Sequence, residues 1–348
     1  MRSILYEHYG EPGDVLRLCD VPDLPAPASG EVLIRVHSRA VHPGDLLGIR
    51  GRYRSPGNTA DVAPSGARPG FEGAGVIEAV GPNVVASTGL TPDRRVAFFP
   101  AKGAWSDYVL APAKFVTPVP DEVSDAVAGQ LHVNPLTASM LARAVDETGV
   151  GEGDLIVLSA AGSAVAKLAM TLALRKRLSV VGVVRTNAGA VSLQSSFPGA
   201  AIVSTEDNDW HDRVRSAAAG KPMRAVLDPV GGVLASELIA LLADGGSFIG
   251  YGDLSSQPIS IPPLSLPVRG LTMKGVSVGN WASLPEAMRT ADIRSAIELA
   301  RTASHLFPVA AEDALAQVKD AVVHAEQSGR TGSVLLTSVH NNQRTERS

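Results

Sequence analysis

The chain has one cysteine, Cys19, among its 348 residues. A single cysteine cannot form a disulfide within the chain, and it cannot supply a cysteine-rich structural zinc site, which needs about four ligands. Cys19 follows the alternating residues Leu16-Arg17-Leu18, so we interpret it as a small hydrophobic residue of a strand. The cysteine content indicates a reducing compartment.

Long apolar runs and basic clusters are also lacking. No stretch approaches the roughly 20 consecutive apolar residues of a membrane helix, and Met1–Gly10 is charged, without the apolar core of a signal peptide. The formal net charge is −4, and no basic stripe is present that could neutralise phosphates. We therefore expect a soluble, cytoplasmic protein that acts on a small molecule, with no membrane and no nucleic-acid partner.

Short strands and dense turn residues characterise the first third of the chain. Apolar and polar residues alternate over 31–37, and further short strands are expected over 75–80 and 95–99, with Pro and Gly between them. This pattern predicts a barrel-like β domain.

From Asp154 onward, apolar runs alternate with helical segments. The runs are 155–159, 179–184, 201–204, 225–227 and 247–251, with helices expected over 164–175 and 232–242. This order predicts the α/β class, with a doubly wound parallel sheet of the Rossmann type.

After Leu271 the chain returns to a mixture of strands and helices. We expect strands over 272–278 and 332–336 and helices over 287–303 and 312–327. The simplest account is a Rossmann domain, 122–270, inserted into a β-rich domain made of 1–121 and 271–340, with a disordered tail over 341–348.

The turn after the first apolar run is a candidate phosphate site. Residues 159–166 form a loop of small residues that enters a helix, where free amides and the helix dipole can hold a phosphate. Gly162 is the one glycine of this loop, and Ala164 and Ala166 stand where glycines often occur. Alanine is an accepted variant at the last position, whereas Ala164 places a methyl group near the pyrophosphate. An alanine-rich helix packed on a sheet explains the loop equally well.

Arg185 ends the second strand of this region, about 20 residues past the loop, where an acidic residue binds the ribose of NAD and an arginine suits a 2′-phosphate. Since no Asp or Glu lies in that window, NADPH is favoured over NADH, although a solvated arginine at a strand end fits too. Residues 228–232, Asp-Pro-Val-Gly-Gly, follow another strand, where ligands bind in open α/β sheets; a plain turn is an equal alternative.

A tyrosine in a loop of Gly and Arg, Tyr53, is the candidate proton donor. Its phenol, with a reference pKa of about 10, is protonated at neutral pH and can donate to a developing enolate, although loop tyrosines are commonly structural. A catalytic zinc needs Cys, His and acidic ligands. Cys19 lies elsewhere, Glu72 has no adjacent His, and His42 and His132 are isolated in the sequence, so we expect no metal.

Together these segments resemble the zinc-lacking medium-chain dehydrogenase/reductase superfamily over nearly the whole chain. The likeness is greatest to mitochondrial-type 2-enoyl thioester reductases and next to quinone oxidoreductases. It rests on His42-Pro-Gly-Asp45 with Gly51-Arg-Tyr53, on 70–75 with 80–84, on 103–106, on Val133-Asn-Pro-Leu-Thr-Ala138, and on Val184-Arg185, Val230-Gly-Gly232 and Tyr251-Gly252. His42 stands where the family commonly has Asn.

The resemblance implies a GroES-like catalytic domain, a Rossmann domain, bound NADPH and a homodimer. The catalytic residues it implies are Tyr53, Asn134 and Trp105. The cofactor-binding residues it implies are Thr137, Gly162, Ser163, Ala164, Val165, Arg185, Asn187, Val230, Gly231, Tyr251 and Gly252.

The expected activity is the NADPH-dependent reduction of activated carbon–carbon double bonds, above all of 2-enoyl thioesters carried by coenzyme A or acyl carrier protein. One alternative is an NADPH quinone oxidoreductase. Another is a catalytically weak NADPH-binding sensor or structural homologue, which the methyl group of Ala164 keeps open.

Overall fold

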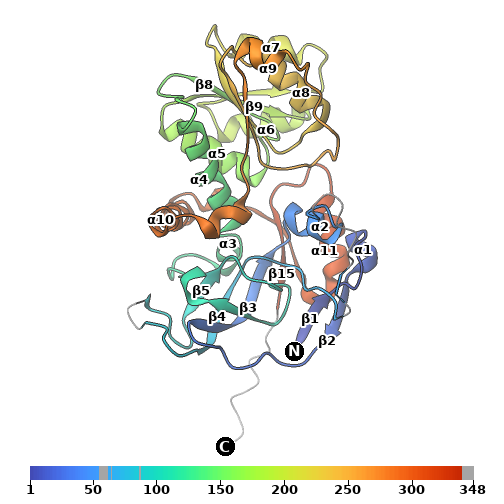
Figure 1. Ribbon diagram of the computed structural model, residues 1–348, viewed down its shortest axis with the longest axis vertical. Helices are drawn as coiled ribbons and strands as arrows, with labels where there is room; N and C mark the ends of the chain where they lie inside the picture. The colour runs from blue at the N-terminus through green and yellow to red at the C-terminus, as the bar shows by residue number, and fades with distance from the viewer. Residues whose placement is uncertain (55–61, 64, 86–87, 339–348) are drawn as a thin grey trace, which may run out of the picture. The chain divides into compact units, whose positions relative to one another are not determined.

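The computed structural model describes residues 1–54, 62–63, 65–85 and 88–338 (Figure 1). By its contacts the chain divides into two compact units. The first consists of Met1–Val133 and Ile293–Ser348, and the second of Asn134–Asp292. The disordered tail expected over 341–348 lies outside the described residues. Within the described ranges, no helix combines the length and the apolar character that crossing a membrane requires.

The first unit is built on two sheets. Strands β1 (Arg2–Leu5) and β2 (Arg17–Asp20) form an antiparallel pair. The larger sheet contains β3 (Glu31–Ala40), β4 (Gly73–Val80), β5 (Arg95–Phe98), β6 (Tyr108–Pro112), β7 (Val116–Pro118), β14 (Val309–Ala314) and β15 (Ser333–Thr337). Its order in the described residues is β14-β15-β3-β4-β5-β7, with β6 also paired to β3. The short helices are α1 (Pro12–Val15), α2 (Pro43–Ile49), α3 (Asp125–Ala128) and α11 (Val318–Glu326), with 3-10 turns at Ala113–Phe115, Ser304–Leu306 and Leu315–Gln317.

The alternation seen in the sequence of β3 decides which face of the sheet is buried. Val32, Ile34 and Val36 are completely buried, while Leu33 and Arg35 between them are half-buried. Successive strand residues point to opposite faces, so one face of β3 packs into the core and the other does not. The strand expected over 31–37 is confirmed and extends to Ala40.

The second unit contains one parallel sheet. Its strands are β8 (Leu155–Leu158), β9 (Ser179–Val184), β10 (Ala201–Ser204), β11 (Met223–Asp228), β12 (Ser247–Gly250) and β13 (Thr272–Gly275). Its helices are α4 (Val133–Asp146), α5 (Ala164–Arg175), α6 (Asn187–Ser196), α7 (Trp210–Ala217), α8 (Gly232–Leu241), α9 (Ser265–Arg269) and α10 (Glu286–Thr302), with a 3-10 turn at Val278–Ser283. The strand order is β10-β9-β8-β11-β12-β13. This is the doubly wound order, whose direction reverses between β8 and β11, and it confirms the predicted fold class.

The unit boundaries differ from the ones expected at 121/122 and 270/271. Gln130 donates from its side chain to the carbonyl of Phe307 and accepts from the Ser333 hydroxyl, and these bonds tie the segment before α4 to the first unit. At the other end, β13 pairs in parallel with β12 and therefore belongs to the second unit. The expected boundaries lie at loops, because the amino-acid composition changes there. The contacts between residues divide the chain elsewhere, near the start of α4 and inside α10.

Two expected elements also have different bounds. The strand expected over 272–278 stops at Gly275. Residues 312–314, which we expected to open a helix, complete β14, and the helix α11 begins only at Val318. The parallel pairing of β14 with β15 satisfies the backbone of these residues and overrides their helical pattern.

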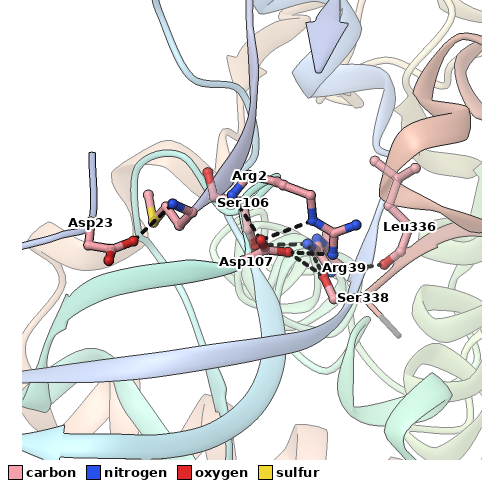
Figure 2. A network of polar contacts seen from close by, with 8 residues as sticks. Arg2, Asp23, Arg39, Ser106, Asp107, Leu336 and Ser338 are labelled. Carbon is pink, nitrogen blue, oxygen red and sulfur yellow. Dashed lines mark hydrogen bonds and ion pairs between the residues drawn. The ribbon is translucent and has the colours of Figure 1, made fainter. Parts of the chain in front are cut away.

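A buried arginine anchors the end of β3 (Figure 2). Arg39 is completely buried. Its guanidinium donates to the carbonyl of Ser106 at 2.8 Å and to the hydroxyl of Ser338 at 2.7 Å. Asp107 lies beside it and accepts three bonds from Arg2, one from the backbone at 2.8 Å and two from the guanidinium at 3.1 and 3.0 Å. The network therefore joins β1, β3, the approach to β6 and the residue after β15.

The charges of this network shift the pKa values of its members. Burial lowers the pKa of Arg39 to about 9, although the charge of Asp107 acts against it, so Arg39 stays charged at neutral pH. Burial also tends to raise the pKa of Asp107, but the hydrogen bonds and charge of Arg2 outweigh it and lower that pKa. A carboxyl with a lowered pKa adds stability above the unfolded value of about 4, and this stability is lost as the pH falls through the folded value.

Replacing Asp107 with Asn tests this network. We expect Asp107→Asn to lower the free energy of unfolding at pH 7 by about 3 kcal/mol, because it leaves the buried Arg39 without its neighbouring anion. Urea unfolding measures the change, and the difference from the wild type should narrow as the pH falls from about 4 through the lowered pKa of the folded wild-type carboxyl.

Asp23→Asn is the control, since Asp23 pairs with the N-terminal ammonium but is 89% exposed. Asp23→Asn should lower the free energy of unfolding by less than about 0.5 kcal/mol. If the two variants lost equal amounts of unfolding free energy, the buried network would not be important for stability.

Candidate functional site

A buried carboxylate, Glu72, connects three segments of the first unit. Glu72 is 1% exposed. One of its oxygens forms an ion pair with Nε2 of His42, which precedes α2. The other accepts the backbone N–H groups of His132 at 3.0 Å and Val133 at 2.8 Å. The two histidines that are isolated in the sequence therefore both contact Glu72, His42 through its ring and His132 through its backbone.

The start of α2 is held by the same group of buried residues. The carboxylate of Asp45 accepts the backbone N–H of His42 at 2.9 Å, as a helix-capping acidic residue does. Burial alone would lower the pKa of His42, but the charge and hydrogen bond of Glu72, together with the charge of Asp45, raise it. Burial raises the pKa of Asp45 to about 6, against the charge of His42.

His132 behaves differently from His42. Its ring lies against Phe99, with centroids 6.5 Å apart, and its Nε2 lies 3.0 Å from the hydroxyl of Thr117. Burial lowers the pKa of His132 to about 4, although the charge of Glu72 opposes the shift. This histidine is neutral at physiological pH. In the part of the chain that the structure describes, no group of three or more His, Cys, Asp or Glu side chains could hold a metal ion.

Tyr53 lies just after α2 and is accessible. Its side chain is 63% exposed. A Cβ atom built on Gly44 would lie 3.3 Å from the Tyr53 hydroxyl oxygen, so the phenol lies close to the first turn of α2. Partial desolvation by the surrounding chain, and then the charge of Asp45, raise the pKa of Tyr53. The phenol is therefore protonated at neutral pH and able to donate a proton or hydrogen bond.

Trp105, the other candidate of the first unit, is completely buried in its hydrophobic core. Its indole N–H has no hydrogen-bond partner among the described residues. Gly70 lies directly against it, since a Cβ atom at that glycine would lie 2.5 Å from the indole ring. A catalytic role for Trp105 stays a prediction.

In the second unit, the loop after β8 presents two free amides. Ser163 begins α5 and its hydroxyl accepts the N–H of Ala166 at 3.3 Å. The N–H groups of Ala164 and Val165 have no acceptor among the described residues. A Cβ atom at Gly162 would meet nothing within 4 Å, so the space above the loop is open. A helix start of this kind suits a phosphate group.

The loop after β11 lies next to it at the carboxyl ends of the strands. Asp228 is buried and accepts the hydroxyl of Ser159 on one oxygen and the N–H groups of Val230 at 3.1 Å and Gly231 at 2.7 Å on the other. Burial raises the pKa of Asp228, against these hydrogen bonds. Gly231 has φ of 76°, a conformation that favours glycine. The bonds of Asp228 thus join the loops on both sides of the point where the strand order reverses.

Tyr251 follows β12 and reaches Ser163 in the candidate phosphate loop. Its hydroxyl is buried near Ser163, without a hydrogen bond of normal geometry. Burial raises the pKa of Tyr251, and Ser163 acts against the shift. Gly252, the next residue, is required by close packing, because a Cβ atom there would lie 2.7 Å from the carbonyl oxygen of Pro229.

The remaining candidates lie after β9, at the start of α6 and on α4. Arg185 is exposed and has no hydrogen-bond or ion-pair partner in the described ranges. Asn187 is the first residue of α6 and is also exposed. Asn134 and Thr137 are buried and lie one turn apart on α4, on the same side of the helix.

The residues of the second unit fit a dinucleotide. Free amides at a helix start, a buried hydroxyl at Tyr251 and the Arg185 guanidinium all lack partners among the described residues and lie at the carboxyl ends of parallel strands, where such ligands bind. The sequence analysis placed Ser159 and Asp228 in candidate loops and Asp45 in a family motif, but it gave no role to the Ser159 hydroxyl or to the acidic side chains of Asp45, Glu72 and Asp228. The available signal was a lone acidic residue inside an apolar or glycine-rich stretch, which must find partners when it is buried.

Comparison with known proteins agrees with this architecture. A family model for the alcohol dehydrogenase GroES-like domain matches residues 28–121, and a model named zinc-binding dehydrogenase matches residues 164–292. A mitochondrial enoyl-[acyl-carrier-protein] reductase of Arabidopsis thaliana is 28% identical over 287 residues, which cover 81% of this chain and 73% of that protein.

Solved structures with the same fold include a mycobacterial protein complexed with NADPH. It is 26% identical, with a TM-score of 0.84 over 97% of this chain and 100% of that one. A mycobacterial quinone oxidoreductase is also 26% identical, with a TM-score of 0.78 over 97% of this chain and 99% of that one.

Fold and site together define an oxidoreductase that combines a GroES-like domain with a doubly wound parallel sheet. The chain belongs to the medium-chain dehydrogenase/reductase superfamily, and the resemblance stated from its motifs is confirmed.

The contacts of Glu72 lead to a test of its structural role. We expect Glu72→Gln to lower the free energy of unfolding by about 3 kcal/mol, because it breaks the buried pair with the ring of His42. Urea unfolding at pH 7 measures the loss.

Glu78→Gln provides the control on the neighbouring strand β4. Glu78 pairs with Arg35, but its side chain is 48% exposed, so its loss should cost about 0.5 kcal/mol. If Glu72→Gln were no more costly than this control, the buried pair would not hold the three segments together.

Proposed function

We propose that this chain is an NADPH-dependent reductase of activated carbon–carbon double bonds, and that its substrates are 2-enoyl thioesters. The observation that carries the proposal is the pair of free amides at Ala164 and Val165, which open a helix at the carboxyl end of β8. The NADPH complex of the mycobacterial relative and the enoyl reductase from Arabidopsis support it.

In this proposal, different residues of the second unit bind different parts of the cofactor. Gly162, Ser163, Ala164 and Val165 hold the pyrophosphate through backbone amides and the helix dipole. Arg185 and Asn187 bind the 2′-phosphate, where an arginine suits NADPH. Further contacts come from Val230 and Gly231 after β11, from Tyr251 and Gly252 after β12, and from Asn134 and Thr137 on α4 near the nicotinamide.

Tyr53 performs the acid step in this proposal. When bound, NADPH supplies a hydride to the β-carbon of the alkene. Tyr53, whose pKa is raised, remains protonated at neutral pH and donates either a proton to the α-carbon or a hydrogen bond to the enolate oxygen. A donor that binds the enolate better than the thioester lowers the barrier. Trp105 supports this region from the core without reaching solvent.

A quinone oxidoreductase is the second candidate function, favoured by the solved mycobacterial relative of that name. A quinone accepts hydride without a proton donor placed at an α-carbon. The methyl group of Ala164 favours a third possibility, a catalytically weak NADPH-binding protein.

We also propose a homodimer that pairs through β13. This strand ends the parallel sheet, and all four of its residues are exposed. Met273 on β13 is an exposed apolar residue. Leu264, just before α9, and Val268, in α9, are also exposed and apolar. An open edge strand with apolar side chains is a template for pairing with another chain. The single cysteine supports a reducing compartment, for which we propose the cytoplasm, although the Arabidopsis relative is named as mitochondrial.

Calorimetry with NADPH and steady-state assays test the catalytic proposal. We expect NADPH to bind, and crotonyl-CoA to be reduced with a higher kcat/KM than 1,4-benzoquinone. Tyr53→Phe should lower turnover of crotonyl-CoA by at least about tenfold, since losing one such donor typically costs 10²–10³, with little change in NADPH affinity.

Tyr9→Phe is the matched control, because the Tyr9 ring packs against Gly51 and Arg54 of the same loop. It should keep wild-type turnover. Wild-type turnover in Tyr53→Phe would remove Tyr53 from the chemistry, and a preference for benzoquinone would favour the second function.

Light scattering tests the dimer. Met273→Lys places a charge on the open edge and should shift the protein to monomer, because lysine on an edge strand opposes pairing. Val191→Lys, at an exposed position of α6, should remain dimeric. A wild-type monomer would disprove the proposal.

A further inference from the structure

The carboxylates of Glu206 and Asp207 lie at the start of α6, which begins two residues after Arg185. The backbone N–H of Asn187 donates to the carboxylate of Glu206 at 2.7 Å. The side-chain amide of Asn187 donates to Asp207 at 3.2 Å. Both acidic residues follow β10, which pairs in parallel with β9. The helix itself is already capped, since the hydroxyl of Thr186 accepts the N–H of Gly189 at 3.1 Å.

The two carboxylates differ in how their charges are balanced. Asp207 forms an ion pair with Arg213 on α7. Glu206 is exposed and has no cationic partner in the described part of the chain. Arg185 is likewise exposed without a partner there. The adenosine end of the proposed cofactor site therefore carries one unbalanced positive charge and one unbalanced negative charge.

We infer that Glu206 is a specificity-determining residue that limits the preference for NADPH over NADH, an inference that rests on the proposed function. A 2′-phosphate at Arg185 carries close to two negative charges and would repel Glu206 at short range. It would also compete with Glu206 for the backbone N–H of Asn187, which donates to Glu206. The ribose hydroxyls of NADH, in contrast, can donate to the Glu206 carboxylate, as they do to acidic residues of NAD-binding domains.

The two charges thus favour different cofactors. Arg185 favours the phosphorylated ribose of NADPH, and Glu206 favours the unphosphorylated ribose of NADH. The wild-type protein therefore prefers NADPH over NADH less strongly than a protein that keeps Arg185 but lacks the charge of Glu206. Asp207 contributes little to this discrimination, because Arg213 neutralises it.

Glu206→Gln tests the inference on the full-length chain. Glutamine keeps an oxygen that can accept the N–H of Asn187. The variant therefore removes the charge of Glu206 and keeps this hydrogen bond. Calorimetry at 0.15 M salt should show NADPH binding about tenfold more tightly than in the wild type, with NADH binding unchanged or weaker. The gain for NADPH should shrink as salt is raised, since exposed charges are screened.

Asp209→Asn is the matched control, because it removes the same charge from an exposed residue of the same loop. It should leave the ratio of NADPH to NADH affinity unchanged. If Glu206 had only a structural role, Glu206→Gln would weaken the binding of both cofactors alike or of neither. An unchanged ratio of NADPH to NADH affinity in this variant would therefore overturn the inference. NADPH binding to the wild type would still uphold the proposed function. If neither cofactor bound the wild type, the proposed function itself would fail.

Discussion

The buried carboxylate of Glu72 is the constraint on which the first unit depends. A charge removed from water must be paired and fully hydrogen-bonded, and Glu72 meets this condition only by drawing together His42 and the amides of His132 and Val133. Those contacts fix where α2 begins and where α4 begins. Tyr53, whose hydroxyl lies near Gly44 in the first turn of α2, takes its place from the same group of contacts.

The second unit solves a similar problem with Asp228. Its two oxygens bind the loop after β8 through Ser159 and the loop after β11 through Val230 and Gly231. The carboxyl ends of the central strands are therefore held by bonds within the protein, and the amides of Ala164 and Val165 are left free. In the proposed function, a site made ready in this way would need little rearrangement to bind a phosphate, which preserves binding energy.

Periodic patterns in the sequence predicted the regular parts of the fold well. The helix over 164–175 and the strands over 179–184 and 201–204 have their expected bounds, because continuous apolar runs and helical spacing report burial directly. The pattern failed at 312–314, where pairing of β14 with β15 decides the conformation. It also predicted domain boundaries at loops, because composition says nothing about hydrogen bonds such as those of Gln130.

The sequence by itself determined the fold class and the candidacy of the loop over 159–166, of Tyr53 and of Arg185, since each follows from local spacing and residue type. Only the tertiary structure decided that His42 and His132 meet at Glu72, and that Glu206 accepts the amide of Asn187, two residues after Arg185. These pairs lie 19 to 60 residues apart. Long-range electrostatic pairing depends on distances in space, which no local pattern of residues records.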